Sequence, residues 1–258
     1  MDEKEYLHMY QEEEHHWWYV GMRAIVLSLL PPDSLPAHPV VLDAGCGTGY
    51  NMGWLRRHYG AVVTGIDYFQ QALGFCRCRG EYALVRADAA AIPFSRNSFD
   101  LVVSFDVLTH LKDAAARAAA LGEFLRVLRP GGRLLLRVAA YEYLRSSHDA
   151  ANMTRHRYGR RELHDAVVSA GFRTLRVTGA NTILFPAAFL WRMLKKAGLA
   201  PAGSDVRART RGGKRLNQAI TFILKIEAAI LRHGSFGFGL SIFLLAAKSD
   251  PVREPAGG

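Results

Sequence analysis

Short apolar runs alternate with amphipathic helical stretches along most of this chain. The apolar runs lack the regular polar alternation of a half-buried strand, which is typical of strands covered on both faces. Strands separated by helices of this length are typical of a parallel α/β sheet. We therefore predict a doubly wound α/β fold with seven strands, at residues 40–44, 62–67, 82–88, 99–105, 133–139, 173–179 and 239–247.

Two parts of the chain lie outside this alternation. The first precedes the first strand and looks helical as far as Pro31 and Pro32, and the second holds two amphipathic helical stretches, 184–198 and 214–232. Within the alternation, the Pro-Gly-Gly run at 130–132 predicts a turn before the fifth strand. The predicted division is an N-terminal helical lid at 1–36, a core at 37–181, a helical insertion between strands six and seven at 182–236, and the last strand with a tail at 237–258.

Composition places this pattern in a globular protein. The chain has 258 residues, of which 50% are hydrophobic and 22% charged, enough to bury a core without disulfides. Its cysteines, Cys46, Cys76 and Cys78, form no CxxC pair, so we expect a reducing compartment and no disulfide scaffold.

The acidic N-terminus is unlike a signal peptide. The longest apolar run, Ile183 to Trp191, has nine residues, whereas a span needs ~20. We expect a cytoplasmic location.

A glycine-rich loop follows the first predicted strand, at the sheet edge where open α/β folds bind ligands. Gly45, Gly47 and Gly49 follow Asp43 in a GxGxG pattern, and glycines there take positive φ and let the backbone approach a ligand. The dinucleotide fingerprint GxGxxG needs a glycine where Tyr50 stands, and no GK[ST] follows for a P-loop. The spacing therefore disfavours a nicotinamide dehydrogenase and excludes a P-loop.

Carboxylates end the next two predicted strands. Asp67 ends the second strand, 20 residues after Gly47, where an acid accepts hydrogen bonds from ribose hydroxyls. Asp88 ends the third strand, where it can accept from an exocyclic amine. Either residue alone would suit a turn or a helix cap, but the ordered set favours a site for an adenosine ligand.

With these motifs in order, the chain resembles the class I S-adenosylmethionine (SAM)-dependent methyltransferases of the broad type 11 group. The resemblance rests on VLDAGCGTGYN, VTGID, RADAAAIPF, FDLVVSFDVLTHL and LRPGGRLLL, from Val40 to about Ala140. It implies a Rossmann-like methyltransferase sheet whose seventh strand is antiparallel, SAM as the cofactor and S-adenosylhomocysteine as its product. The implied cofactor-binding residues are Asp43, Gly45, Gly47 and Gly49 at the methionine part, Asp67 at the ribose, Asp88 at the adenine amine, Tyr68 and Ala89 beside the adenine ring, and Ser104 and Phe105 at the methionine end.

The flanks resemble one bacterial subgroup of that family with an N-terminal HWW segment. The similarity lies in EEEHHWWYVGMR and in SSHDAANMTRHRYGRRELHDAVVSAGF, and it fixes no substrate. We expect most aromatic residues of the first stretch to pack on the sheet. Trp18 is the candidate lid residue over the SAM sulfonium, through cation–π attraction, and Arg23 the candidate partner of the SAM carboxylate.

Methyl transfer to an oxygen often uses a general base, which contributes ~10²–10⁴-fold, and histidine titrates in the suitable range. His110 follows the fourth strand, and His148 and His156 lie in the arginine-rich loop after the fifth. The alternatives are packing or helix capping for His110, a solvated loop for the other two, and no base at all for a carbon or amine acceptor. We expect no metal site, because the histidines are scattered without HExxH or Cys/His spacing.

The net charge of +10 is unevenly distributed, since residues 126–161 carry nine arginines against Glu142 and Asp149. Such a stretch suits an anionic partner or forms a solvated surface.

We predict a monomeric or homodimeric O-methyltransferase for a small-molecule acceptor that is anionic or a sugar, lipid or secondary metabolite. The alternatives are a nucleic-acid methyltransferase, although the fourth strand lacks a following [DN]PP[YF] motif, and a SAM-binding fold with other chemistry. Peripheral membrane contact is an alternative for the amphipathic insertion.

Overall fold

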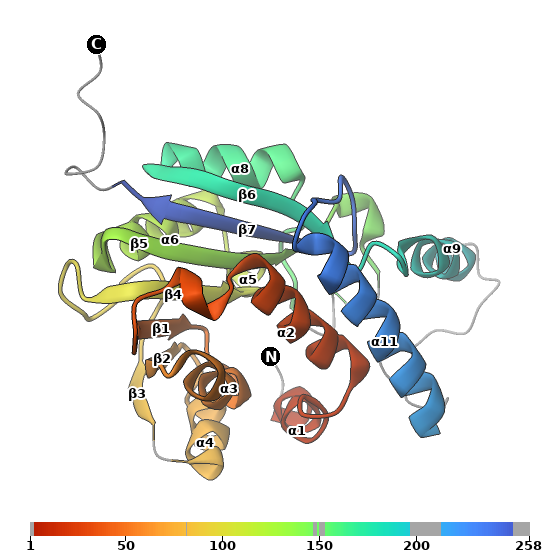
Figure 1. The fold of residues 1–258 in the computed structure, drawn as a ribbon, viewed down its shortest axis with the longest axis horizontal. Helices are drawn as coiled ribbons and strands as arrows, with labels where there is room; N and C mark the ends of the chain where they lie inside the picture. Colours follow the sequence, from red (N-terminus) through yellow and green to blue (C-terminus); the bar gives the residue numbers. More distant parts are fainter. Residues whose placement is uncertain (1–2, 81, 147–148, 150–152, 197–212, 250–258) are drawn as a thin grey trace.

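The computed structural model describes residues 3–80, 82–146, 149, 153–196 and 213–249. Within these residues, seven strands form one sheet in the order β3-β2-β1-β4-β5-β7-β6 (Figure 1). β7 is antiparallel to β5 and β6, and the other pairs are parallel. The doubly wound fold and the antiparallel last strand are confirmed. The strands are β1 (Val40–Ala44), β2 (Val62–Asp67), β3 (Ala83–Arg86), β4 (Phe99–Phe105), β5 (Leu128–Ala139), β6 (Phe172–Ala180) and β7 (Ser241–Lys248).

Helices cover both faces of this sheet (Figure 1). Val41 and Val103 face one core and their neighbours Leu42 and Val102 face the other. Strands that bury both faces have no polar side to alternate with, which explains their unbroken apolar runs. The first core contains α2 (Trp17–Leu29), α3 (Tyr50–Tyr59), α4 (Gln70–Arg79) and α11 (Gly213–Leu231), and the second contains α5 (Val107–His110), α6 (Ala114–Val127) and α8 (Arg160–Ser169).

β5 begins earlier than predicted. Leu128 already pairs with Phe99, and the register then shifts between Phe99 and Leu101. Gly131, in the Pro-Gly-Gly run, has a φ of 74°. A bulge accommodates extra residues without ending the ladder, so this run interrupts a continuing strand. The strand therefore starts at Leu128 and not at 133, while the break at the Pro-Gly-Gly run is present and regular pairing with β4 resumes at Arg133.

The N-terminal part and the insertion contact one another. The N-terminal part forms α1 (Glu3–Glu12) and α2, and α11 of the insertion packs along α2. A Cβ added to Gly21 of α2 would lie 2.2 Å from Cδ1 of Leu224, so the missing side chain allows the close approach. The backbone N–H of Trp17 donates to Oδ1 of Asn217 at 2.8 Å. The two helices therefore form one layer over the sheet.

Three further elements lie in the described chain. They are two 3₁₀ turns, η1 (Pro32–Ser34) and η2 (Glu142–Leu144), and the helix α9 (Phe185–Lys196). α9 and η2 follow the carboxyl ends of β6 and β5, and therefore lie near the edge of the sheet where the glycine loop begins. None of the described helices has the length and apolar character to cross a membrane.

Candidate active site

The glycine loop curls over the carboxyl ends of β1 and β2. Gly45, Gly47 and Gly49 have φ angles of 87°, 56° and 83°, which residues with a side chain rarely adopt. The backbone N–H groups of Gly45 and Cys46 both donate to the Ile66 carbonyl, at 2.8 and 2.9 Å. A Cβ at position 45 would lie 2.0 Å from Cγ2 of Val107. The loop is therefore held against β2 and leaves no room for a side chain there.

Asp67 joins this loop to the segment after β2. Its Oδ2 accepts the N–H of Gly47 at 3.0 Å, and its Oδ1 accepts the N–H of Phe69 at 2.9 Å. Burial raises the pKa of this carboxyl group, while these backbone donors oppose the shift. An ionised carboxylate has about four acceptor positions, and the backbone of Tyr68 also bonds to this one, so Asp67 keeps room to accept a bond from a ribose hydroxyl.

The predicted adenine end of the site is open to solvent. Tyr68 is 58% exposed, and Asp88 is exposed with its Oδ1 accepting the N–H of Ala90 at 2.9 Å. Ala89 is buried. Tyr68 directly follows β2, whereas β3 ends at Arg86, two residues before Asp88, so Asp88 does not end the strand as predicted. Contacts of these residues with an adenine ring stay a prediction.

The predicted methionine end is buried and holds polar atoms without partners. Asp43 and Ser104 are each 1% exposed, and Oδ2 of Asp43 and Oγ of Ser104 have no hydrogen-bond partner among the described residues. Burial raises the pKa of Asp43 to about 7, with a smaller contribution from the nearby Asp67. Buried polar atoms cost free energy unless they are hydrogen-bonded. The residues at this end therefore fit a ligand that supplies donors, such as the ammonium group of SAM.

The pKa of Asp43 gives a testable pH dependence. Because the pKa in the folded protein lies above the ordinary value of 3.8, the folded state keeps a proton that the unfolded state releases. This stabilisation is complete below pH 3.8 and is lost as the pH rises through about 7. Asp43→Asn removes the titration. We expect the free energy of unfolding of this variant, relative to wild type, to rise by on the order of 2 kcal/mol from pH 5 to pH 8.

Urea unfolding at the two pH values measures this change. Asp165→Asn is the matched control, because the Asp165 side chain is 75% exposed beside His164. We expect the control to follow wild type at both pH values. The same pH dependence in Asp43→Asn and wild type would contradict the raised pKa.

An ion pair that the sequence analysis missed lies between β4 and β5. Arg137 is 9% exposed and its Nη2 donates to Oδ2 of Asp106 at 2.6 Å. Its guanidinium lies over the rings of Trp18, at 4.5 Å, and Phe105, at 5.1 Å. The positive charge of Arg137 partly opposes the rise in the pKa of Asp43. The signal in the sequence was an arginine within an otherwise apolar run, but only the paired strands show its partner.

The first helix lies over the glycine loop. Tyr6 is buried beside Phe69, with ring centroids 6.4 Å apart, and Asp67 contributes to raising its pKa. A Cβ at Gly47 would lie 3.1 Å from Cε of Met9. α1 therefore covers the loop and the ribose-binding candidate Asp67, which is the arrangement expected of a lid.

Glu13 fastens this helix to the loop. Its buried carboxylate accepts a hydrogen bond from the Thr48 hydroxyl and pairs with Nη2 of Arg79 at 2.7 Å. Arg79 also donates to the carbonyls of Thr48 and Tyr10, at 3.1 and 2.5 Å. The network joins α1, the loop and α4, and none of its long-range pairs follows from sequence spacing.

Replacing Glu13 by glutamine is expected to lower the free energy of unfolding by about 1–2 kcal/mol, because Arg79 loses its buried counter-charge while a hydrogen bond is kept. Urea unfolding measures the loss. Glu142→Gln is the control, since the side chain of Glu142 is 60% exposed in its pair with Arg145, and exposed pairs contribute about 0–1 kcal/mol. Equal losses in the two variants would refute a special role for the buried pair.

Trp18, the predicted lid residue, and Arg23, the predicted partner of the SAM carboxylate, both make contacts within the fold. Trp18 lies against Arg137, as described above, and Nη2 of Arg23 donates to the carbonyls of Glu13 and Glu14 at 2.8 and 3.3 Å. Arg23 therefore holds the turn between α1 and α2. Contact of Trp18 with the sulfonium and of Arg23 with the SAM carboxylate stay predictions.

The three candidate bases differ in their surroundings. Nδ1 of His110 lies 3.2 Å from the Met153 carbonyl, which can only accept, so Nδ1 carries the proton and Nε2 is left as an acceptor. His110 also lies close enough to Asp67 to affect the pKa of that carboxyl group. Nε2 of His156, in contrast, is 2.5 Å from Oε1 of Glu162. His148 lies outside the described residues. The geometry favours His110 for general-base chemistry at this site.

The similarity to known proteins lies in the part of the chain that carries the glycine loop and the strand-end acids. Residues 42–136 match a family described as "Methyltransferase domain". The tRNA (carboxymethyluridine(34)-5-O)-methyltransferase ALKBH8 of Macaca fascicularis is 39% identical over 109 residues, which are 42% of this chain and 16% of that protein. The O-methyltransferase cnsE of Penicillium expansum is 36% identical over 103 residues, 37% of this chain and 36% of that protein. The chain spans less than half the length of these curated relatives.

Solved structures share the fold over most of the chain. Phosphoethanolamine N-methyltransferase 2 of Haemonchus contortus, in complex with SAM, has a TM-score of 0.58 at 19% identity, covering 90% of this chain and 53% of that one. A SAM-dependent methyltransferase of Mesorhizobium loti has a TM-score of 0.56 at 18% identity, covering 92% of this chain and 100% of that one. At these identities the similarity is one of fold.

The strand order, the GxGxG loop and the acidic residues at the strand ends are those of the class I SAM-dependent methyltransferase fold, and the chain contains a region that matches the methyltransferase domain family. Residues 42–136 form its methyltransferase domain. SAM is the cofactor of this class, and structures with the same fold have been solved with SAM and with S-adenosylhomocysteine.

Proposed function

We propose that this protein transfers a methyl group from SAM to an oxygen atom of a small anionic acceptor, with His110 as the general base. The observation that carries the proposal is the hydrogen bond from Nδ1 of His110 to the Met153 carbonyl, which leaves Nε2 able to accept a proton. The candidate base ends α5, the short helix after β4, and lies close enough to Asp67 to affect the pKa of that carboxyl group. It therefore stands beside the proposed cofactor site.

Bound SAM supplies an activated methyl group for an in-line displacement. The chain supplies orientation and proton transfer. In the proposal, Asp67 holds the ribose, the buried Asp43 and Ser104 accept hydrogen bonds at the methionine end, and α1 excludes water through its Glu13 contacts. Nε2 of His110 removes the proton from the acceptor hydroxyl as the new bond to carbon forms.

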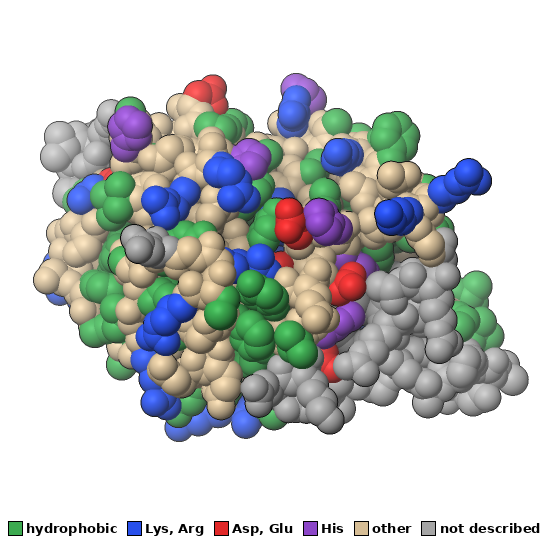
Figure 2. Space-filling view, turned by 90° about the horizontal axis from the view of Figure 1, so that it is seen from below, with side chains coloured by type: hydrophobic (Ala, Val, Ile, Leu, Met, Phe, Trp, Pro, Cys, Tyr) green, Lys and Arg blue, Asp and Glu red, His purple; other side chains and the backbone are tan. Residues whose placement is uncertain are grey.

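RNA is the second candidate acceptor, because some curated relatives are named as tRNA methyltransferases and the net charge is +10. Nucleic-acid binding is typically served by a basic patch or stripe. On the face seen in Figure 2, Lys and Arg side chains lie among apolar, acidic and histidine side chains and also gather along the lower left edge. The small acceptor is kept as the first candidate because the proposal rests on His110, and the RNA acceptor is decided by the assay.

The test is an assay of S-adenosylhomocysteine formation from SAM, with a panel of small phosphates, carboxylates and glycolipid precursors, and with bulk tRNA in a parallel series. Turnover of an anionic small molecule at an oxygen, analysed by mass spectrometry of the product, supports the proposal. Turnover of tRNA alone overturns the choice of acceptor. Failure of the folded protein to bind SAM or S-adenosylhomocysteine in calorimetry overturns the proposed activity.

A further inference from the structure

The outer side of α11 carries large apolar side chains. Phe222, Ile226 and Ile230 are 65%, 43% and 48% exposed. They are four residues apart, and side chains at this spacing follow one another along one side of a helix. A surface helix of a globular protein usually carries polar residues on the side away from the core. We call these three side chains the apolar stripe, and such a surface is typical of a binding site for a partner.

A different side of α11 packs on the protein. Leu224 and Leu231 are fully buried in the core that also contains α2. Oε2 of the buried Glu227 accepts the backbone N–H groups of Thr182 and Ile183, at 2.8 and 2.9 Å. The helix is therefore fixed through its inner side, and the apolar stripe is not used for folding contacts of that kind.

Positive charge lies beside the apolar stripe. The cations exposed on α11 and directly after it are Lys214, Arg215, Lys225 and Arg232. Arg215 lies two turns before Phe222 and Lys225 one turn after it, which are neighbouring positions on a helix. Glu227, the acid of this helix, is buried. The exposed surface of α11 therefore combines apolar and cationic side chains without an exposed carboxylate.

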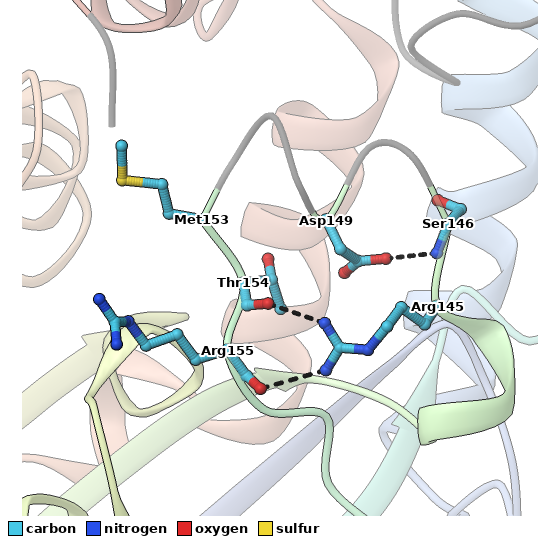
Figure 3. Close-up of a pocket in the computed structure, with 6 residues that line it drawn as sticks. All are labelled: Arg145, Ser146, Asp149, Met153, Thr154 and Arg155. Carbon is cyan, nitrogen blue, oxygen red and sulfur yellow. Dashed lines mark hydrogen bonds between the residues drawn. The ribbon is translucent and has the colours of Figure 1, made fainter.

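The cations of α11 differ from those of the arginine-rich stretch at 126–161. In that stretch Arg145 donates to the carbonyls of Thr154 and Arg155, at 2.9 and 3.1 Å (Figure 3), and Arg157 pairs with Asp149 at 2.8 Å. The arginines of the stretch that pair with a carboxylate are Arg126, Arg129, Arg137, Arg145 and Arg157. Within the part of the chain that the structure describes, no ion pair includes a cation of α11. The charge of α11 is therefore available to an anionic partner.

A second copy of this chain is the alternative occupant of the apolar stripe. A two-fold symmetric contact places the same surface of each copy against the other. The cations of one α11 would then approach those of the other, with no exposed carboxylate on either helix to pair with them. Like charges across an interface oppose association. Charge complementarity therefore favours an occupant that is anionic and also takes up apolar side chains.

We propose that α11 binds the surface of an anionic lipid bilayer, with the apolar stripe among the acyl chains and Arg215 and Lys225 at the phosphate groups. Amphipathic helices with aromatic and aliphatic residues on one side and Lys or Arg on the other bind membranes in this way. Long cationic side chains reach the phosphates while their stems stay on apolar surface. α11 lies along the outside of the molecule, where a bilayer can reach it (Figure 1). The contact is independent of the proposed methyl transfer.

The test is co-sedimentation of the full chain with vesicles of phosphatidylcholine that contain phosphatidylglycerol, and with vesicles of phosphatidylcholine alone. We expect about tenfold tighter binding to the anionic vesicles, because each cation near the surface adds attraction. Phe222→Ser should weaken this binding about tenfold, since its ring no longer enters the acyl region. Lys225→Gln should weaken binding to the anionic vesicles and leave binding to the neutral ones unchanged.

Val168→Ser is the matched control, and circular dichroism confirms that each variant is folded. Val168 is 46% exposed on α8, which packs on the opposite face of the sheet from α11. We expect this variant to bind vesicles as wild type does.

The remaining outcomes overturn the inference. They are equal binding to anionic and neutral vesicles, and a loss in Val168→Ser as large as that in Phe222→Ser. Sedimentation equilibrium without lipid tests the second copy, and a dimer that Phe222→Ser dissociates would assign the apolar stripe to that contact. Binding of S-adenosylhomocysteine is measured on the same samples, so a failure of the proposed function is seen separately from a failure to bind vesicles.

Discussion

Replacing His110 by glutamine is expected to lower kcat for an oxygen acceptor by about 10²–10⁴-fold, the usual contribution of a general base. Glutamine keeps a donor for the Met153 carbonyl but offers no nitrogen that can take a proton at neutral pH. The affinity for SAM should change little, because His110 is outside the residues proposed to hold the cofactor. The measurement is kcat and KM with an acceptor found in the panel, together with calorimetry for SAM.

His164→Gln is the matched control for this experiment. His164 lies on α8 and pairs with Asp165 at 3.0 Å, and it is not among the residues proposed for the site. We expect its kcat to equal that of wild type. A kcat for His110→Gln within a few-fold of wild type would remove His110 as the base and favour an acceptor that needs none, such as a carbon or an amine.

Replacing Asp67 by alanine is expected to weaken SAM binding about a hundredfold, which corresponds to ~2.7 kcal/mol. Two effects add. The ribose would lose its acceptor, and the N–H groups of Gly47 and Phe69 would lose the carboxylate that positions them. Calorimetry with SAM and S-adenosylhomocysteine measures the change. Asp88→Ala should cost less, because Asp88 is exposed to water.

Asp165→Ala serves as the control for binding, and circular dichroism confirms that each variant is folded. We expect the control to bind SAM as wild type does. Unchanged SAM affinity in folded Asp67→Ala would show that the ribose is held elsewhere, and the assignment of the loop and strand ends as the cofactor site would have to be revised.

Much of the geometry of the candidate cofactor site could be predicted because its determinants are local. The strand that ends at Ala44, the glycines that follow it and Asp67 at the end of β2 are each fixed by short apolar runs and by turn chemistry. Parallel strands bring their carboxyl ends to one edge, so the residues after them had to meet. The start of β5 was missed because Leu128 pairs with Phe99 before the Pro-Gly-Gly break, a long-range contact that the local turn preference does not encode.

The sequence alone thus determined the class of fold, the position of the loop and the acids at the strand ends. Only the tertiary structure decided which groups meet across long distances in the chain: Glu13 with Arg79, Arg137 with Asp106, and His110 with the Met153 carbonyl. It also decided that α11 packs on α2 and that the apolar stripe of α11 stays exposed. The physical reason is that residue spacing encodes the periodicity of single elements, whereas these contacts arise from how separate elements pack.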